Sequence, residues 1–121
     1  MAVVLVVDDS STVRQQLKVF LENLGHTVLE AENGQHGLDI ATEHPEIQLF
    51  TIDVNMPVMN GIDMIKGVRK LADHQKTPVF MLTTESGKDT MQEAKAAGVT
   101  AWIVKPFKPE FLMKGIQKVL G

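Results

Sequence analysis

The sequence predicts an α/β protein built on a five-stranded, doubly wound parallel sheet with helices on both faces. Two observations support this fold class. Short aliphatic runs without polar alternation recur along the chain, as in strands that are buried on both faces. Each run is followed by a segment whose apolar residues have helical spacing, so the connections should be right-handed crossovers. Such crossovers bring all strand carboxyl ends to one edge of the sheet.

Each expected strand is a short apolar run that stops at a polar or turn-forming residue. In chain order the expected strands are Val3–Val7, Thr27–Ala31, Ile47–Asp53, Val79–Leu82 and Thr100–Val104. The second is the weakest of the five. The third is the best defined, because it is apolar almost throughout and stops at Asp53, where Asn55 and Pro57 cannot continue a central ladder.

The expected helices cover residues 13–24, 38–44, 62–71, 86–97 and 109–120. Polar residues from Ser10 to Thr12 can cap the first helix, and Asn60 is a candidate cap for the third. Gly34 and Gly37 make the second helix marginal, because glycine is a poor helix former. Pro109 suits the first turn of the last helix.

The fourth helix should be the most weakly anchored. Ser86 and Asp89 form a loose capping box at its start, and Gly98 ends it. Its only sizeable apolar residue is Met91, which stands among alanines. The segments of a protein that move most readily are its least stable parts, so this helix is a candidate for movement.

The composition indicates a single domain and argues against several classes of function. The 121 residues, 44% of them hydrophobic, are expected to form a single domain over 1–121. A net charge of −3 without any basic run argues against binding to nucleic acid or to anionic membranes. The chain has no cysteine, and the apolar start at Met1–Val7 is too short for a signal peptide or a membrane span. A cytoplasmic protein is therefore expected.

The histidines do not predict a metal site. They lie far apart in the sequence, without the spacing of metal ligands, and surface positions are expected for them: His26, His36, His44 and His74.

Polar residues from four strand ends should meet at the carboxyl edge of the sheet, where open α/β sheets bind ligands. They are Asp8, Asp9, Asp53, Thr83, Thr84 and Lys105. Three clustered carboxylates repel one another and favour a hard cation such as Mg²⁺, which takes carboxylate, water and phosphate oxygens. Lys105 and Thr83 can contact phosphate oxygens, and Asp53 can attack a phosphoryl group to form an aspartyl phosphate.

Taken alone, each of these residues also has an ordinary structural explanation. Asp8 or Asp9 can cap the first helix, Thr83 can satisfy loop backbone, and Lys105 can be a solvated lysine. The combination carries the prediction.

These motifs resemble the receiver domain of two-component response regulators. The residues concerned are Asp8-Asp9, the stretch from Asp53 to Gly61, Thr83 and Lys105-Pro106-Phe107. The resemblance covers essentially the whole chain and is closest to the stand-alone, CheY-like chemotaxis type. It implies a flavodoxin-like fold with strand order 2-1-3-4-5.

The resemblance also implies roles for individual residues. Asp53 would accept the phosphoryl group from a sensor histidine kinase, and Thr83 and Lys105 would contact that group. Mg²⁺ would be bound by Asp9 directly, by Asp8 mostly through water, by Asp53, and by the backbone carbonyl of Asn55. The peptide bond between Lys105 and Pro106 would be cis.

A switch is implied as well, in which Thr83 moves toward the phosphoryl group and an aromatic residue on the fifth strand turns inward. That position holds Trp102, where tyrosine or phenylalanine is commoner. Trp102 is then either the switching side chain or a fixed wall of the partner surface. Asn55 and Glu85 occupy positions that tune hydrolysis of the phosphoryl group.

The implied output is a monomeric signalling switch whose surface of fourth helix, fifth strand and fifth helix engages a partner. The partner would be a flagellar motor switch protein or a phosphatase, and Thr84-Glu85 and Trp102 favour chemotaxis. Other single-domain receivers act as phosphorelay intermediates or as phosphate sinks for a kinase.

Two further function classes stay open from the sequence. A phosphohydrolase with Asp53 as nucleophile usually carries a second acid two residues on, and here that residue is Asn55. A flavodoxin-like cofactor binder could hold phosphate at Ser10-Ser11-Thr12, although the two preceding acids would repel it.

Overall fold

A computed structural model describes residues 2–84, 87–106 and 108–120. Strands and helices alternate, and the five strands form one parallel sheet in the order β2-β1-β3-β4-β5, which confirms the expected strand order. The strands are β1 Val3–Val7, β2 Thr27–Ala31, β3 Ile47–Ile52, β4 Val79–Thr83 and β5 Ala101–Val104. The helices are α1 Ser11–Asn23, α2 Gly34–Glu43, α3 Gly61–Arg69, α4 Lys88–Ala97 and α5 Pro109–Leu120, with a short 3₁₀ helix, η1, at Ala72–His74.

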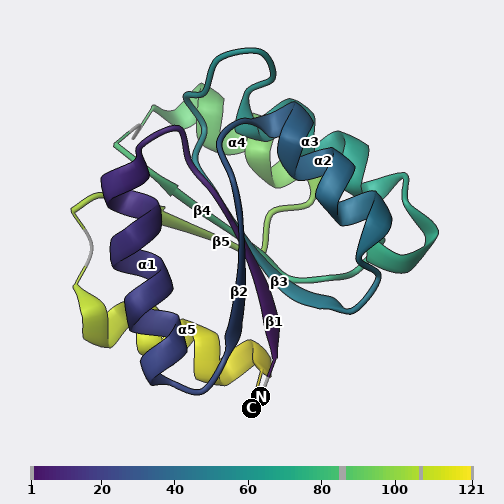
Figure 1. The fold of residues 1–121 in the computed structure, drawn as a ribbon. Coiled ribbons are helices and arrows are strands. Elements are labelled where there is room, and N and C mark those ends of the chain that lie inside the picture. The colour runs from purple at the N-terminus through teal and green to yellow at the C-terminus, as the bar shows by residue number, and fades with distance from the viewer. Residues whose placement is uncertain (1, 85–86, 107, 121) are drawn as a thin grey trace.

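Helices cover both faces of the sheet. Figure 1 shows α1 and α5 on one face and α2, α3 and α4 on the other. Each face has its own hydrophobic core, because successive residues of a strand point to opposite sides. Leu5, Phe50 and Ile52 lie in the core under α2, α3 and α4, whereas Val4 and Leu49 lie in the core under α1 and α5.

Strand register determines which polar residues become neighbours. Val7 of β1 pairs with Ile52 of β3, so Asp8 and Asp53 are the next residues on two adjacent strands. The amide N–H of Asp53 still donates to the carbonyl of Val7, at 3.0 Å. The sequence therefore places both acids at the point where the central ladder ends.

The glycines of α2 serve close packing, where the sequence suggested only a marginal helix. A Cβ atom on Gly34 would collide with the carbonyl oxygen of Met59, and one on Gly37 would come within 2.7 Å of the Met64 methyl group. The Gly34 N–H also donates to the Met59 carbonyl at 3.1 Å. Contacts of this kind with α3 and the preceding loop offset the low helix propensity of glycine.

His74 corrects the expectation that all four histidines lie on the surface. It is fully buried at the end of η1, a turn that the sequence did not predict. Its Nε2 lies 3.1 Å from the carbonyl oxygen of His44, its Nδ1 lies 2.9 Å from Thr77 Oγ1, and its ring meets Phe50 edge-on. Because a carbonyl only accepts, Nε2 carries a proton, and in the neutral ring Nδ1 then accepts from the threonine hydroxyl.

The fourth helix is weakly anchored, as expected, but it begins differently. Its N-cap is Gly87, which has no side chain to cap with, and Asp89 stands in the first turn. Ser86 of the expected capping box lies outside the described residues. Only Ala94 is buried in this helix, so α4 contributes little to the core.

Small differences in strand ends have local causes. Thr83 belongs to β4, because its carbonyl accepts from Lys105 N–H at 2.7 Å. Thr100 precedes β5, and its hydroxyl accepts from the N–H of Val79 at 3.0 Å. Within the described residues, no helix is both long and apolar enough to cross a membrane.

Candidate functional site

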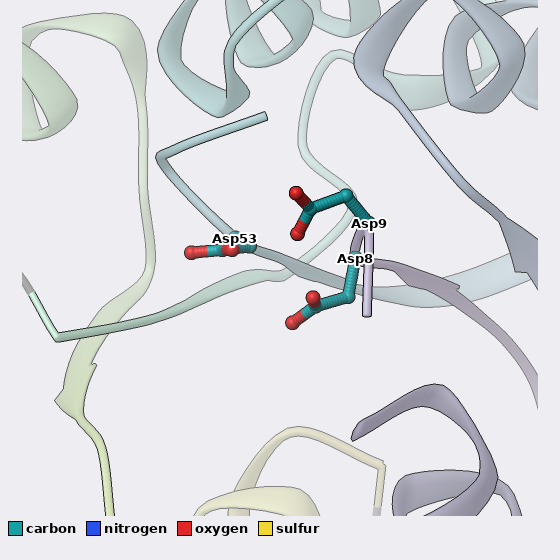
Figure 2. Close-up of side chains that lie close together, drawn as sticks. All are labelled: Asp8, Asp9 and Asp53. Carbon is teal, nitrogen blue, oxygen red and sulfur yellow. The ribbon is translucent and has the colours of Figure 1, made fainter. Parts of the chain in front are cut away.

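Three carboxylates meet at the carboxyl edge of the sheet. Asp8 and Asp9 follow β1, and Asp53 follows β3; one oxygen of each lies within 4.8 Å of the others. Figure 2 shows the three side chains projecting to the same side of the strand ends. Asp8 is almost fully buried, Asp53 is largely buried and Asp9 is exposed. The site is therefore a cluster of acids that is buried at Asp8 and open to solvent at Asp9.

The backbone around Asp8 is held on several sides. Its N–H donates to the carbonyl of Ala31 at 3.1 Å, and its Oδ1 accepts from Ser10 N–H at 2.9 Å. Ser10 is the N-cap of α1, and its hydroxyl accepts from Val13 N–H at 3.3 Å. Neither acid is therefore the side-chain cap of α1, which removes the alternative explanation for Asp8 and Asp9.

Lys105 reaches the acids from the end of β5. Its Nζ lies 2.7 Å from Asp8 Oδ2 and 3.9 Å from Asp53 Oδ2, so it forms ion pairs with both. The peptide bond that follows it, to Pro106, is cis. A single cation thus partly neutralises two of the three clustered carboxylates.

Burial raises the pKa of Asp53 above that of an ordinary aspartate. Lys105 opposes this effect, the negative charges of Asp8 and Asp9 add to it, and a hydrogen bond from the Asn55 N–H counteracts it. Asp53 thus carries a charge that its surroundings leave incompletely compensated.

The cluster suits a hard divalent cation. All of its donors are carboxylate oxygens, and they are close enough to share one ion. Carboxylate oxygens together with water are the ligands that Mg²⁺ takes in proteins. One positive ammonium against three carboxylates leaves negative charge for a cation to neutralise. The residues present therefore fit Mg²⁺.

The other candidate residues differ in burial. Thr83 is fully buried at the end of β4, whereas Asn55 is exposed in the loop after β3. Trp102 is half-buried in β5 and packs against the core under α2, α3 and α4. Its indole Nε1 is buried and has no hydrogen-bond partner among the described residues. Glu85 lies outside the described residues.

The contact between Arg14 and Asp8 was not predicted from the sequence. From α1 Arg14 donates through one terminal N–H to the carbonyl of Asp8 at 2.6 Å, and its Nε lies 3.3 Å from Glu30 Oε1 on β2. On the sequence it is one polar position of an amphipathic helix. Only the turn between Asp8 and Ser10 brings it back toward the acids.

The similarity to known proteins extends over nearly the whole chain. A family model for the response regulator receiver domain matches residues 4–117. The chemotaxis protein CheY homolog of Campylobacter jejuni is 45% identical over 118 residues, which are 97% of this chain and 91% of that protein. Chemotaxis protein CheY1 of Helicobacter pylori is 43% identical over 118 residues, which are 97% of this chain and 95% of that protein.

Solved structures show the same likeness. The structure of chemotaxis protein CheY4 from Vibrio cholerae matches with a TM-score of 0.92 and 44% identity, and the match covers 98% of both chains. The parallel sheet, the acids at its carboxyl edge and these similarities agree with one another. The chain belongs to the response regulator receiver domain family.

Proposed function

We propose that this response regulator accepts a phosphoryl group on Asp53 from a sensor histidine kinase and signals in chemotaxis. The observation that carries the proposal is the cluster of three carboxylates with oxygens within 4.8 Å, contacted by the Lys105 ammonium. Asp53 follows the central strand β3, and burial raises its pKa. A partly desolvated carboxylate is a suitable nucleophile.

The chain's own residues supply an in-line transfer. A carboxylate oxygen of Asp53 forms a bond to phosphorus while the bond from phosphorus to the donor's leaving atom breaks, and the leaving group keeps that electron pair. Lys105 pairs with the phosphoryl oxygens, and the Thr83 hydroxyl donates a hydrogen bond to one of them. The product is an aspartyl phosphate, which water later hydrolyses.

Asp8, Asp9, Asp53 and the backbone carbonyl of Asn55 would hold Mg²⁺. The ion, when bound, neutralises charge on the carboxylates and on the incoming phosphoryl oxygens. Asp8 also holds Lys105 at 2.7 Å, which keeps the ammonium beside Asp53 before the donor arrives.

The proposed output is a change at the surface of α4, β5 and α5. The weak anchoring of α4 through Ala94 supports movement there. Trp102 on β5 is the proposed switching side chain, with Thr83 as the group that senses the phosphoryl oxygen. The partners we propose are a flagellar motor switch protein or a phosphatase, engaged by a monomer in the cytoplasm. The names of the Campylobacter and Helicobacter relatives support chemotaxis.

We propose that the chain acts as a switch and that its chemistry is limited to its own phosphorylation and dephosphorylation. The residue two positions after Asp53 is Asn55, whose amide cannot supply the general acid–base step of a hydrolase that turns over phosphate esters. Asn55 and Glu85 are proposed to tune the lifetime of the phosphoryl group.

Phosphorylation of single-site variants by a small phosphodonor such as acetyl phosphate tests the proposal. With Mg²⁺ present, intact-mass spectrometry should show one added phosphoryl group on the native protein and none on Asp53→Asn. Asp63→Asn, which removes an exposed acid in the first turn of α3, is the matched control and should be phosphorylated normally. Uptake by Asp53→Asn at the native rate would contradict the proposal.

A further inference from the structure

The carbonyl oxygen of Asp8 lies just beyond the β1–β2 ladder, whose last paired residues are Val7 and Ala31. The Asp8 N–H is still bonded to the Ala31 carbonyl. Its own carbonyl accepts from the Arg14 guanidinium at 2.6 Å. A charged donor makes this a stronger bond than one between neutral groups. Arg14 therefore replaces the strand partner that Asp8 lacks on this side.

Arg14 closes a ring of hydrogen bonds around the two acids that follow β1. The Arg14 N–H donates to the Ser10 carbonyl at 3.0 Å, while Ser10 N–H donates to Asp8 Oδ1. The Arg14 side chain then returns to the Asp8 carbonyl. Asp9 is the residue between the fixed points Asp8 and Ser10, so this ring sets the direction in which its side chain leaves the backbone.

Asp9 depends on that backbone more than the other two acids do. Its carboxylate is exposed and forms no hydrogen bond or ion pair within the described part of the chain. Asp8 is held by Ser10 and Lys105, and Asp53 by the Asn55 N–H and by Lys105. A ligand whose side chain has no support of its own can be oriented only through its main chain.

The guanidinium is held in turn by β2. Arg14 Nε lies 3.3 Å from Glu30 Oε1, and Lys18 Nζ lies 3.6 Å from the other oxygen of the same carboxylate. The Arg14 side chain is mostly buried, whereas the Glu30 carboxylate is about one-third exposed. The pair contributes little to stability by itself, but it fixes the plane of a side chain whose donors point in set directions.

We propose that Arg14 is a positioning residue for the cation site: by holding the Asp8 carbonyl it orients Asp8 and Asp9 as ligands. The inference rests on the proposed role of these two acids in binding a divalent cation. Partners that orient metal ligands from outside the coordination sphere typically alter metal affinity by about 10- to 100-fold when removed.

If only the charge of Arg14 mattered, its removal would change cation affinity in the opposite direction, which makes the inference easy to test. Arg14 is a cation near three carboxylates, so its removal would strengthen binding of another cation if its charge were its only influence. If Arg14 orients the ligands, its removal weakens binding. The two explanations therefore differ in the direction of the change.

The experiment measures binding of Mn²⁺ to the full chain by electron paramagnetic resonance of the free ion. We expect Arg14→Gln to raise the Mn²⁺ dissociation constant about tenfold. Arg14→Lys keeps the charge but has a single ammonium, so it should weaken binding less. Lys18→Gln is the matched control, because it removes the other cation on Glu30 without a contact to Asp8; its affinity should be unchanged or slightly higher.

Unfolding in EDTA separates positioning from a general loss of structure. Arg14→Lys and Lys18→Gln should melt within a few degrees of the native protein, and their Mn²⁺ affinities should still differ. If Arg14→Gln binds Mn²⁺ as tightly as the native protein or more tightly, the inference is wrong. Should that variant fail to fold, native affinity in Arg14→Lys overturns it instead.

Asp9→Asn distinguishes this inference from the proposed function. It should lose most Mn²⁺ binding if Asp9 is a ligand. If Asp9→Asn binds normally, the cation site itself has been misassigned. If Asp9→Asn loses binding while both Arg14 variants keep it, only the role of Arg14 is refuted.

Discussion

Lys105 and Asp8 form the shortest ion pair among the described residues, with Nζ 2.7 Å from Oδ2. The distance from the same ammonium to Asp53 is 3.9 Å. In this state the lysine is directed mainly to an acid that we propose as a cation ligand, and only secondarily to the proposed phosphoacceptor. A divalent cation and Lys105 therefore compete for the charge of Asp8.

Replacing Lys105 with glutamine should strengthen cation binding and weaken phosphorylation. Without the ammonium, Asp8 is free for the cation, and Mn²⁺ affinity should rise about fivefold, which corresponds to ~1 kcal/mol. Phosphorylation by acetyl phosphate should slow, because the Lys105 ammonium no longer pairs with the phosphoryl oxygens. Lys108→Gln is the matched control, since Lys108 is exposed and lies over the Phe111 ring. Equal Mn²⁺ affinities for the two variants would argue against the competition.

Replacing Asp53 with asparagine should stabilise the metal-free protein at neutral pH. Because burial raises the pKa of Asp53 in the folded state, the fold favours its protonated form. Ionisation therefore costs stability as the pH rises through the folded pKa, and the cost is absent below the unfolded pKa. The variant lacks this cost and should be more stable by about 1 kcal/mol at pH 7.

Urea unfolding of both proteins in EDTA from acid to neutral pH measures that difference. The gap in unfolding free energy between Asp53→Asn and the native protein should grow as the pH rises and close in acid. Asp73→Asn, at an exposed position in η1, should show no such growth. A gap that is constant over pH would mean that ionisation of Asp53 is not its cause.

His74→Ala should unfold more easily without changing the acid cluster. It removes a fully buried ring together with its hydrogen bonds to Thr77 and to the His44 carbonyl. The loss should be roughly 2–4 kcal/mol. His36→Ala, at an exposed position, should change stability by less than about 0.5 kcal/mol. Mn²⁺ affinity should stay native in both variants, because η1 enters the amino end of β4, opposite the site.

Val58 has a backbone conformation that suits its side chain poorly. Its φ is 71°, in the left-handed region, and its side chain is 83% exposed, so packing offers little compensation. A β-branched residue there is destabilising by about 1–2 kcal/mol, whereas asparagine adopts this region readily. Val58→Asn should therefore raise the unfolding free energy by about 1 kcal/mol. Val58→Thr keeps the branch and should not; an equal gain would point to the loss of exposed apolar surface instead.

Trp102 reports on the proposed switch, because it is the only tryptophan. Its Nε1 is buried without a partner among the described residues, which costs free energy in this arrangement. Movement of the ring should change the fluorescence emission when Mg²⁺ and beryllofluoride, a phosphoryl mimic, are added. Asp53→Asn should abolish the change. Constant emission in the native protein would make Trp102 a fixed wall of the partner surface.

The sequence predicted the residues whose positions follow from periodicity and from the edge rule for parallel sheets. Asp8 and Asp53 meet because each follows a strand, and strand ends converge in this fold whatever the side chains do. Lys105 was predicted at the same edge for the same reason. Its preference for Asp8 over Asp53 was not, because a difference of about one ångström depends on side-chain geometry.

The features that the sequence did not reveal depend on contacts between distant segments. His74 is buried because a turn after α3 folds it onto Phe50, and no local pattern marks that turn. Gly34 looked like a weak point of α2, whereas its missing side chain makes room for the Met59 carbonyl. Local propensity is a weak guide wherever tertiary packing decides the choice of residue.

Glycine contacts hold the loop after Asp53 more firmly than α4 is held. The loop from Val54 to Gly61 is tied down at both ends, since Gly61 N–H donates to the Val54 carbonyl and Gly34 N–H to the Met59 carbonyl. A side chain at Gly61 would collide with the Asp53 carbonyl, so the loop packs tightly against the end of β3. On the other side of Asp53, β4 is followed by α4, a helix that starts at Gly87 without a side-chain cap. If phosphorylation of Asp53 displaces the neighbouring backbone, α4 should therefore move more readily than the loop from Val54 to Gly61. The structural change would then spread toward α4 even without a bound partner.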